Sequence, residues 1–326
     1  MKPGKVKESI WKRSVLRQIH TESADSFLTP DNNAGAFPVE KNGDKLWISS
    51  GIMTIQGWTL CAKRAVYGAV NALAAAGAEP RSMEISILMP EETEERQLKE
   101  LVREMDILCE KQDMCLRVGY AAAMPHIEDL IVSVYPMGLR RKEAMNAEAV
   151  SPDMAVVVAG SIGREGAAMI AREREKELLG RYPSFFIKEA AALFEDGAMK
   201  NAADILRQNG ALFIHHPGEG GIFAGFWELA VACKAGLDID LKRIPIRQHT
   251  IEVCEYFNLN PYMLRSEGCL LAVCEDGTGA VARLEEAGFR AAVAGHLTDS
   301  NDRIIRYDDE IRFLEPPKPD EYYKMQ

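Results

Sequence analysis

A segment rich in histidine and glycine in the second half of the chain carries the residue types best suited to chemistry. It reads IHHPGEGG over residues 214–221 and follows an apolar run that predicts a buried strand. Imidazole and carboxylate groups can act as acid, base or ligand, and glycines let a ligand approach the backbone closely. A structural turn that leads into a helix near Phe223 is the alternative. The residues expected to act here are the catalytic candidates His216 and Glu219 and the binding candidates His215, Gly220 and Gly221.

The same segment gives little support for a metal site. Consecutive side chains of an extended strand point to opposite faces, so His215 and His216 are poorly placed to bind one ion. The seven cysteines are scattered and contain no C-x-x-C pair. We therefore expect no metal site, and we expect reduced, mostly buried thiols.

A second glycine-rich segment, GSIGREG at residues 160–166, follows a predicted strand and opens a predicted helix. Unpaired amides at a helix N-terminus can bind phosphate, which makes Gly160 and Gly163 binding candidates. The spacing differs from the dinucleotide-binding pattern, and a tight strand-to-helix turn is the alternative.

Strands and helices that would position these segments alternate along the chain. Apolar periodicity in the first half predicts the order β-α-β-α-β-β, with strands at 44–50, 83–89, 116–121 and 129–135 and helices at 60–76 and 90–109. The second half is expected to be a layered α/β domain with strands at 154–159, 211–215, 268–274 and 290–295 and helices at 166–179, 184–194, 202–208, 223–235, 248–257 and 279–287. A polar stretch at 140–153 separates the halves, which predicts domains at 1–148 and 149–326.

Composition excludes several classes of protein. The 326 residues include 39 Lys and Arg against 49 Asp and Glu, a net charge of −10, so the molecule repels nucleic acid and anionic lipid surfaces. Its apolar runs are far shorter than the roughly 20 residues that a membrane helix needs. The N-terminal residues lack the apolar core of a secretory signal, and we expect a cytoplasmic protein with no nucleic-acid or membrane partner.

Several sequence blocks resemble the AIR synthase (PurM/HypE/ThiL/SelD) superfamily, and they cover nearly the whole chain. The blocks are GSIGREGAAMIA, IHHPGEGGIFAGFWELA, SEGCLLAVCEDG and AAVAGHLTD in the second half and AVYGAVNALAAAGAEPRSMEISILMP in the first. In layout the chain resembles the HypE-like, hydrogenase-maturation members most. The resemblance implies an α+β, two-domain PurM-like architecture, in which an N-terminal mixed sheet forms a barrel with a partner chain and a C-terminal α/β layered domain completes an ATP cleft. It implies a homodimer, with a small molecule or a maturation protein as further partner.

The resemblance also indicates where this chain departs from its family. It adds the binding candidates Asn33, Gly51, Asn71 and Gly119. At four positions where the resemblance implies acids, this chain has Asn33, Gly51, Ala72 and His216. A magnesium ion would therefore lack its usual carboxylate ligands here. We therefore predict a HypE-like protein with an interdomain nucleotide or phosphate pocket whose catalysis is degenerate or altered. An active ATP-dependent enzyme that activates an amide or carbonyl oxygen by phosphoryl transfer, with a rearranged site, is the alternative.

Overall fold

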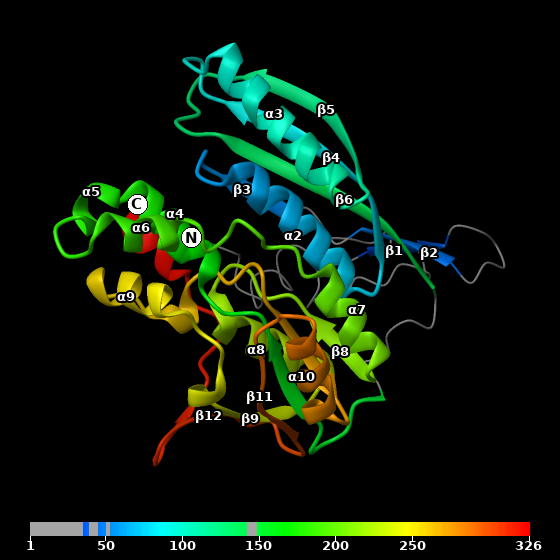
Figure 1. Ribbon diagram of the computed structural model, residues 1–326. Coiled ribbons are helices and arrows are strands. Elements are labelled where there is room, and N and C mark those ends of the chain that lie inside the picture. Colours follow the sequence, from blue (N-terminus) through cyan, green and yellow to red (C-terminus); the bar gives the residue numbers. More distant parts are fainter. Residues whose placement is uncertain (1–34, 39–44, 50–52, 142–148) are drawn as a thin grey trace.

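The computed structural model describes residues 35–38, 45–49, 53–141 and 149–326, and two mixed β-sheets organise them (Figure 1). The strands of the first sheet are ordered β1-β2-β6-β4-β5, and β3 pairs with the remaining half of β6. Two helices, α2 and α3, cover one face of this sheet (Figure 1). The elements are β1 Gly35–Pro38, β2 Lys45–Ser49, β3 Met53–Gln56, α2 Cys61–Ala75, β4 Glu79–Met89, α3 Glu95–Glu110, β5 Cys115–Ala123 and β6 Ile131–Arg141.

Side chains along β4 alternate between buried and partly buried, which explains why this sheet has one covered face. Met83, Ile85 and Ile87 are fully buried beneath the helices, while the residues between them are only partly buried. Helix α3 places Leu101, Met105 and Leu108 on its buried side, and a capping box between Glu94 and Gln97 closes its first turn. It begins at Glu95 rather than at 90, because residues 90–94 form the turn that precedes the cap.

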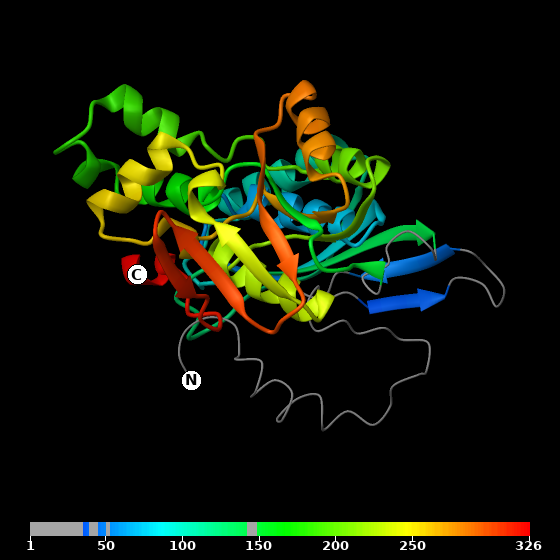
Figure 2. The same cartoon turned by 90° about the horizontal axis from the view of Figure 1, so that it is seen from below.

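The second sheet has seven strands, ordered β13-β12-β9-β11-β7-β10-β8. Its interior strands β7 and β10 are buried along nearly their whole length, as expected of strands covered on both faces. Figure 2 shows helices α4–α6 and α9 grouped to one side, with the C-terminal end beside them. The elements are β7 Ala155–Ala159, α4 Arg164–Glu173, α5 Glu175–Leu178, α6 Ser184–Ala191, α7 Lys200–Gln208, β8 Ala211–His215, α8 Gly221–Cys233, β9 Gly236–Asp240, η3 Leu241–Arg243, α9 Gln248–Tyr256, η4 Pro261–Met263, β10 Leu270–Cys274, α10 Gly277–Glu286, β11 Ala291–Thr298, β12 Arg303–Tyr307, β13 Glu310–Phe313 and η5 Glu321–Met325.

Five strands and several helix bounds differ from the sequence expectations. The short strands β1 and β3 were not expected, and neither were β9, β12 and β13, since acids, arginines or exposed residues interrupt the apolar pattern of these last three. The helix predicted at 166–179 is two helices, because the chain leaves helical geometry at Arg174. The helix predicted from Phe223 begins at Gly221.

Hydrophobic contacts join the two halves. Ala74 and Ala75 of α2 share a core with Ala202 and Leu206 of α7, and Phe194 packs into the core of the first half. The domain boundary between residues 148 and 149 stays a prediction.

All seven cysteines are free, and all except Cys115 are buried. Within the described ranges, the helices are too short or too polar to cross a membrane.

Candidate functional site

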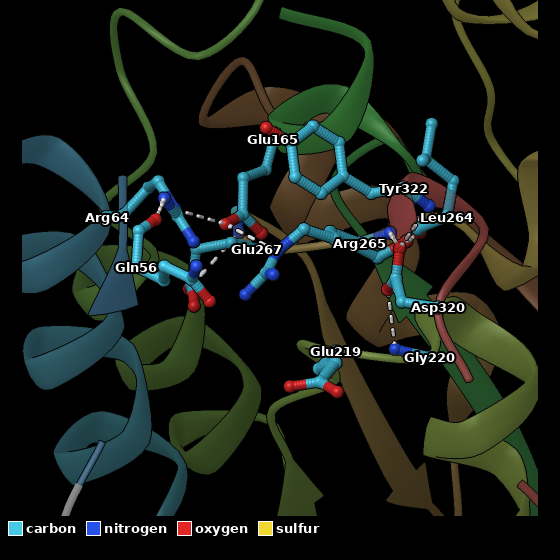
Figure 3. A network of polar contacts seen from close by, with 12 residues as sticks. Gln56, Arg64, Glu165, Glu219, Gly220, Leu264, Arg265, Glu267, Asp320 and Tyr322 are labelled. Carbon is cyan, nitrogen blue, oxygen red and sulfur yellow. Dashed lines mark hydrogen bonds and ion pairs between the residues drawn. The ribbon is translucent and has the colours of Figure 1, made fainter. Parts of the chain in front are cut away.

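A buried ionic triad lies where α2 meets the second half (Figure 3). Arg64 Nε of α2 and Arg265 Nε, in the segment before β10, each lie 3.1 Å from Glu165 Oε1 of α4. Arg64 also donates from Nη1 to the Gln56 carbonyl over 2.9 Å. Burial alone would raise the pKa of Glu165, but Arg265 and Arg64 together hold it below its ordinary value. The triad therefore attaches the first half to the second through charge-assisted hydrogen bonds.

Next to the triad, one carboxylate connects three segments that are far apart in the sequence. Glu267 Oε1 accepts from Asn71 Nδ2 over 2.6 Å and lies 2.5 Å from His216 Nε2. Asn71 is completely buried, and its side chain also bonds the backbone of Gly197 and Met199. The amide and the imidazole thus hold the Glu267 carboxylate at the junction, where only 6% of this residue is exposed. We name Asn71, His216 and Glu267 the junction cluster.

The side chains of His215 and His216 point in different directions, as expected for consecutive residues of a strand. His215 Nε2 lies 2.9 Å from Glu228 Oε2 of α8, inside the second half, whereas His216 joins the junction cluster. Of this pair, the structure therefore brings only His216 together with Asn71. Glu219 lies beside the triad in Figure 3 and accepts from the Tyr323 hydroxyl over 3.3 Å.

Backbone packing accounts for the paired glycines of the 214–221 loop. Both have positive φ, 84° at Gly220 and 69° at Gly221. A Cβ at Gly221 would lie 2.6 Å from the Tyr262 carbonyl. The Gly220 amide, at the start of α8, donates to Asp320 Oδ2 over 2.7 Å. A carboxylate of the same chain thus accepts from a backbone amide at the start of α8.

Asp320 belongs to the segment before η5 and is 2% exposed. Burial raises its pKa to about 6, although Arg265 and the amides of Tyr322 and Gly220 act in the opposite direction. Its carboxylate holds the end of the chain against the loop and the start of α8.

The GSIGREG glycines also serve packing, and they position the Glu267 segment. A Cβ at Gly160 would lie 2.6 Å from the Gly268 carbonyl, so no larger residue allows this close approach. The Gly163 amide donates to Ser266 Oγ over 3.0 Å. These contacts support the tight-turn interpretation, and phosphate binding at Gly160 and Gly163 stays a prediction.

The remaining candidates lie apart or outside the described residues. Gly119 is the bulge residue of edge strand β5, and a Cβ there would meet Glu84 Oε1 at 2.4 Å. Asn33 and Gly51 lie outside the described residues. The sequence analysis missed Glu267, for which the available signal was an acid placed directly before the apolar run of β10.

Two cavities in the described part of the chain are candidates for the expected interdomain pocket. One, of about 350 Å³, lies between α2 and α3 and reaches Arg172 of α4. The other, of about 270 Å³, lies beside β12 and β13. Neither is lined by a residue of 214–221. In the part of the chain that the structure describes, no three His, Cys, Asp or Glu side chains converge to hold a metal ion.

Two family models and several known proteins match this chain. Residues 25–139 match the model of the AIR synthase related protein N-terminal domain, and residues 151–308 match the C-terminal domain. A protein of Methanocaldococcus jannaschii described as a hydrogenase expression/formation protein is 23% identical over 323 residues, covering 93% of this chain and 90% of that protein. Carbamoyl dehydratase HypE of Rhizobium leguminosarum bv. viciae is 26% identical over 251 residues, covering 74% of this chain and 69% of that protein.

Among solved structures, hydrogenase maturation protein HypE in complex with ATP superposes with a TM-score of 0.71 at 16% identity, covering 87% of this chain and 88% of that chain. At this identity the likeness concerns the fold alone. The expected resemblance and the α+β, two-domain PurM-like fold are thereby confirmed.

Proposed function

Because this chain belongs to the AIR synthase-related family, we propose that it is a HypE-like protein of hydrogenase maturation that binds an adenine nucleotide at the junction cluster. The observation that carries this proposal is the Glu267 carboxylate, which Asn71 and His216 hold from opposite halves of the molecule. Burying a charged network costs free energy unless its partners are well placed, and such networks concentrate at functional sites. The ATP held by the solved HypE supports adenine nucleotide as the ligand class.

The described donor set does not fit an ordinary magnesium site. Magnesium takes oxygen ligands and usually joins one or two carboxylates to substrate phosphates. Near the cluster, Glu165 is held by two arginines and Asp320 by backbone amides, and Glu267 within the cluster already accepts from Asn71. Ala72 and His216 stand where the family resemblance implies acids. We propose that the nucleotide binds with little help from magnesium and that phosphoryl transfer is lost or altered.

An active enzyme with a rearranged site is the second candidate, and Glu267 is the observation that favours it. This carboxylate lies 2.5 Å from the His216 imidazole, which is a geometry suited to moving a proton. Sustained release of phosphate from ATP, lost in Glu267→Gln, would support this candidate over the first.

The nucleotide proposal is tested by calorimetric titration of ATP into the wild type and His216→Ala. We expect His216→Ala to weaken binding by at least about tenfold, because a charged or hydrogen-bonding contact to phosphate is worth about 1.5–3 kcal/mol. His249→Ala is the matched control, since His249 on α9 pairs with Glu189 on α6, away from the cluster. Equal affinities in all three proteins, or no ATP binding by the wild type, would contradict the proposal.

A homodimer through the first sheet is the partner we propose. The face of this sheet opposite α2 and α3 exposes Tyr120, Tyr135 and Met137, each at 39% or more. Strands β5 and β6, which pair with opposite edges of β4, place these side chains on one surface, and exposed apolar patches of this kind mark interaction sites. A second copy of the same sheet would cover it, as the family resemblance implies. A small-molecule or protein partner in maturation stays a prediction.

A further inference from the structure

A narrow slot in the second half of the molecule lies among residues that the proposed nucleotide site does not use. It is the cavity of about 270 Å³ beside β12 and β13. One wall is the face of the β12–β13 hairpin, where Ile305 pairs with Arg312 and Tyr307 pairs with Glu310. The opposite wall holds the rings of Phe223 from α8 and Tyr262 from η4.

Three of the eight residues that line the slot are aromatic. The Phe223 and Tyr262 rings are stacked, with centroids 5.2 Å apart and planes within 8° of parallel. Tyr307 supplies a third ring and is 52% exposed, and the Lys242 ammonium lies 5.3 Å from its centroid. Aromatic side chains at a cavity favour a planar ring as ligand, because stacked rings gain dispersion and desolvation free energy over their faces.

Size and charge narrow the class of ligand. Pockets that enclose drug-sized molecules span about 300–1,000 Å³, so this slot suits a system of one or two rings. Arg312 and Glu310 neutralise each other across 2.5 Å, which favours a neutral ligand. Asn260 also lines the slot, and its Oδ1 accepts from the Tyr262 amide. Its Nδ2 can donate to a ring nitrogen or carbonyl.

From these observations we propose that the slot is a second binding site, for the planar heteroaromatic ring of a small neutral molecule of the nucleobase or nucleoside class. Tyr307 stacks on the ring and Asn260 hydrogen-bonds its edge. The site is separate from the junction cluster, so its occupation does not depend on the nucleotide proposal.

Adenosine is the probe, titrated by calorimetry into the full chain with ribose as the ring-free comparison. We expect saturable binding of adenosine and none of ribose. Tyr307→Ala should weaken adenosine binding by at least about fivefold, since base stacking on an aromatic side chain is worth at least this factor. Phe313→Ala is the matched control, because Phe313 is also a largely exposed aromatic side chain on this hairpin but lies on its other face. It should change the affinity by less than about twofold.

Two results would overturn the assignment. One is the absence of saturable adenosine binding, and the other is equal affinity in the wild type and Tyr307→Ala.

His216→Ala separates the two proposals. If this variant alone weakens adenosine binding, the ring occupies the junction cluster and the slot is not its site. Both substituted hairpin side chains are largely exposed, so each variant should keep the wild-type melting temperature within a few degrees.

Discussion

Removal of the central charge of the ionic triad should destabilise the protein strongly. Glu165 is 3% exposed and faces two guanidinium groups, both at 3.1 Å. Glu165→Gln keeps the size of the side chain but removes the carboxylate that both buried cations share, although Asp320 remains near Arg265. Breaking a buried ion pair from one side costs about 3–5 kcal/mol, and we expect a loss in the free energy of unfolding within this range. Arg64→Met should cost less, because the Glu165–Arg265 pair survives it.

Urea unfolding of the wild type and these variants, followed by fluorescence, measures the losses. Arg172→Met is the control, since Arg172 also lies on α4 but its ion pair with Glu195 is 39% and 51% exposed. An exposed pair is worth about 0–1 kcal/mol, so this variant should unfold close to the wild type. A loss below about 1 kcal/mol in Glu165→Gln, or a larger loss in Arg64→Met than in Glu165→Gln, would refute the view that the triad joins the two halves.

Three further outcomes are expected. Calorimetry with magnesium and with a chelator should give ATP affinities within about tenfold, or ~1.4 kcal/mol, and a larger dependence on magnesium would show that other acids hold the metal. The pKa of Asp320 is raised from 3.8 to about 6, so the folded protein retains this proton more tightly than the unfolded chain. As the pH rises from about 4 to 6, the wild type should therefore lose up to about 3 kcal/mol of unfolding free energy relative to Asp320→Asn, and parallel pH curves would contradict this. Light scattering should give a dimer mass for the wild type and a monomer mass for Tyr135→Arg, whereas a wild-type monomer would exclude the proposed interface.

Elements with a strong apolar period were predictable from the sequence. The alternation of β4 and the apolar face of α3 lie on buried surfaces as expected. The hairpin β12–β13 was not predictable in this way, because it is an edge whose residues are mostly exposed and carry arginines and acids. A strand shows alternating apolar and polar residues only when one of its faces is buried, and this hairpin at the edge of the sheet lacks such a face.

The site was only partly predictable, because its contacts join distant segments. Residue types singled out His216 and Glu219, but the Glu267 carboxylate that meets His216 is 51 residues away, and the chain itself does not indicate this contact. The role of Gly220 and Gly221 could not be assigned from the sequence, for a different reason. A positive φ is needed both for close backbone packing and for close approach of a ligand, and only the Tyr262 carbonyl shows that packing applies here.

The central claim, an adenine nucleotide at the junction of the two halves, is tested most directly by a crystal structure of this protein grown with a non-hydrolysable ATP analogue. We expect phosphate groups within hydrogen-bond distance of His216, next to Asn71 and Glu267. Nucleotide density only in the slot beside Tyr307, or no density at saturating analogue, would contradict it.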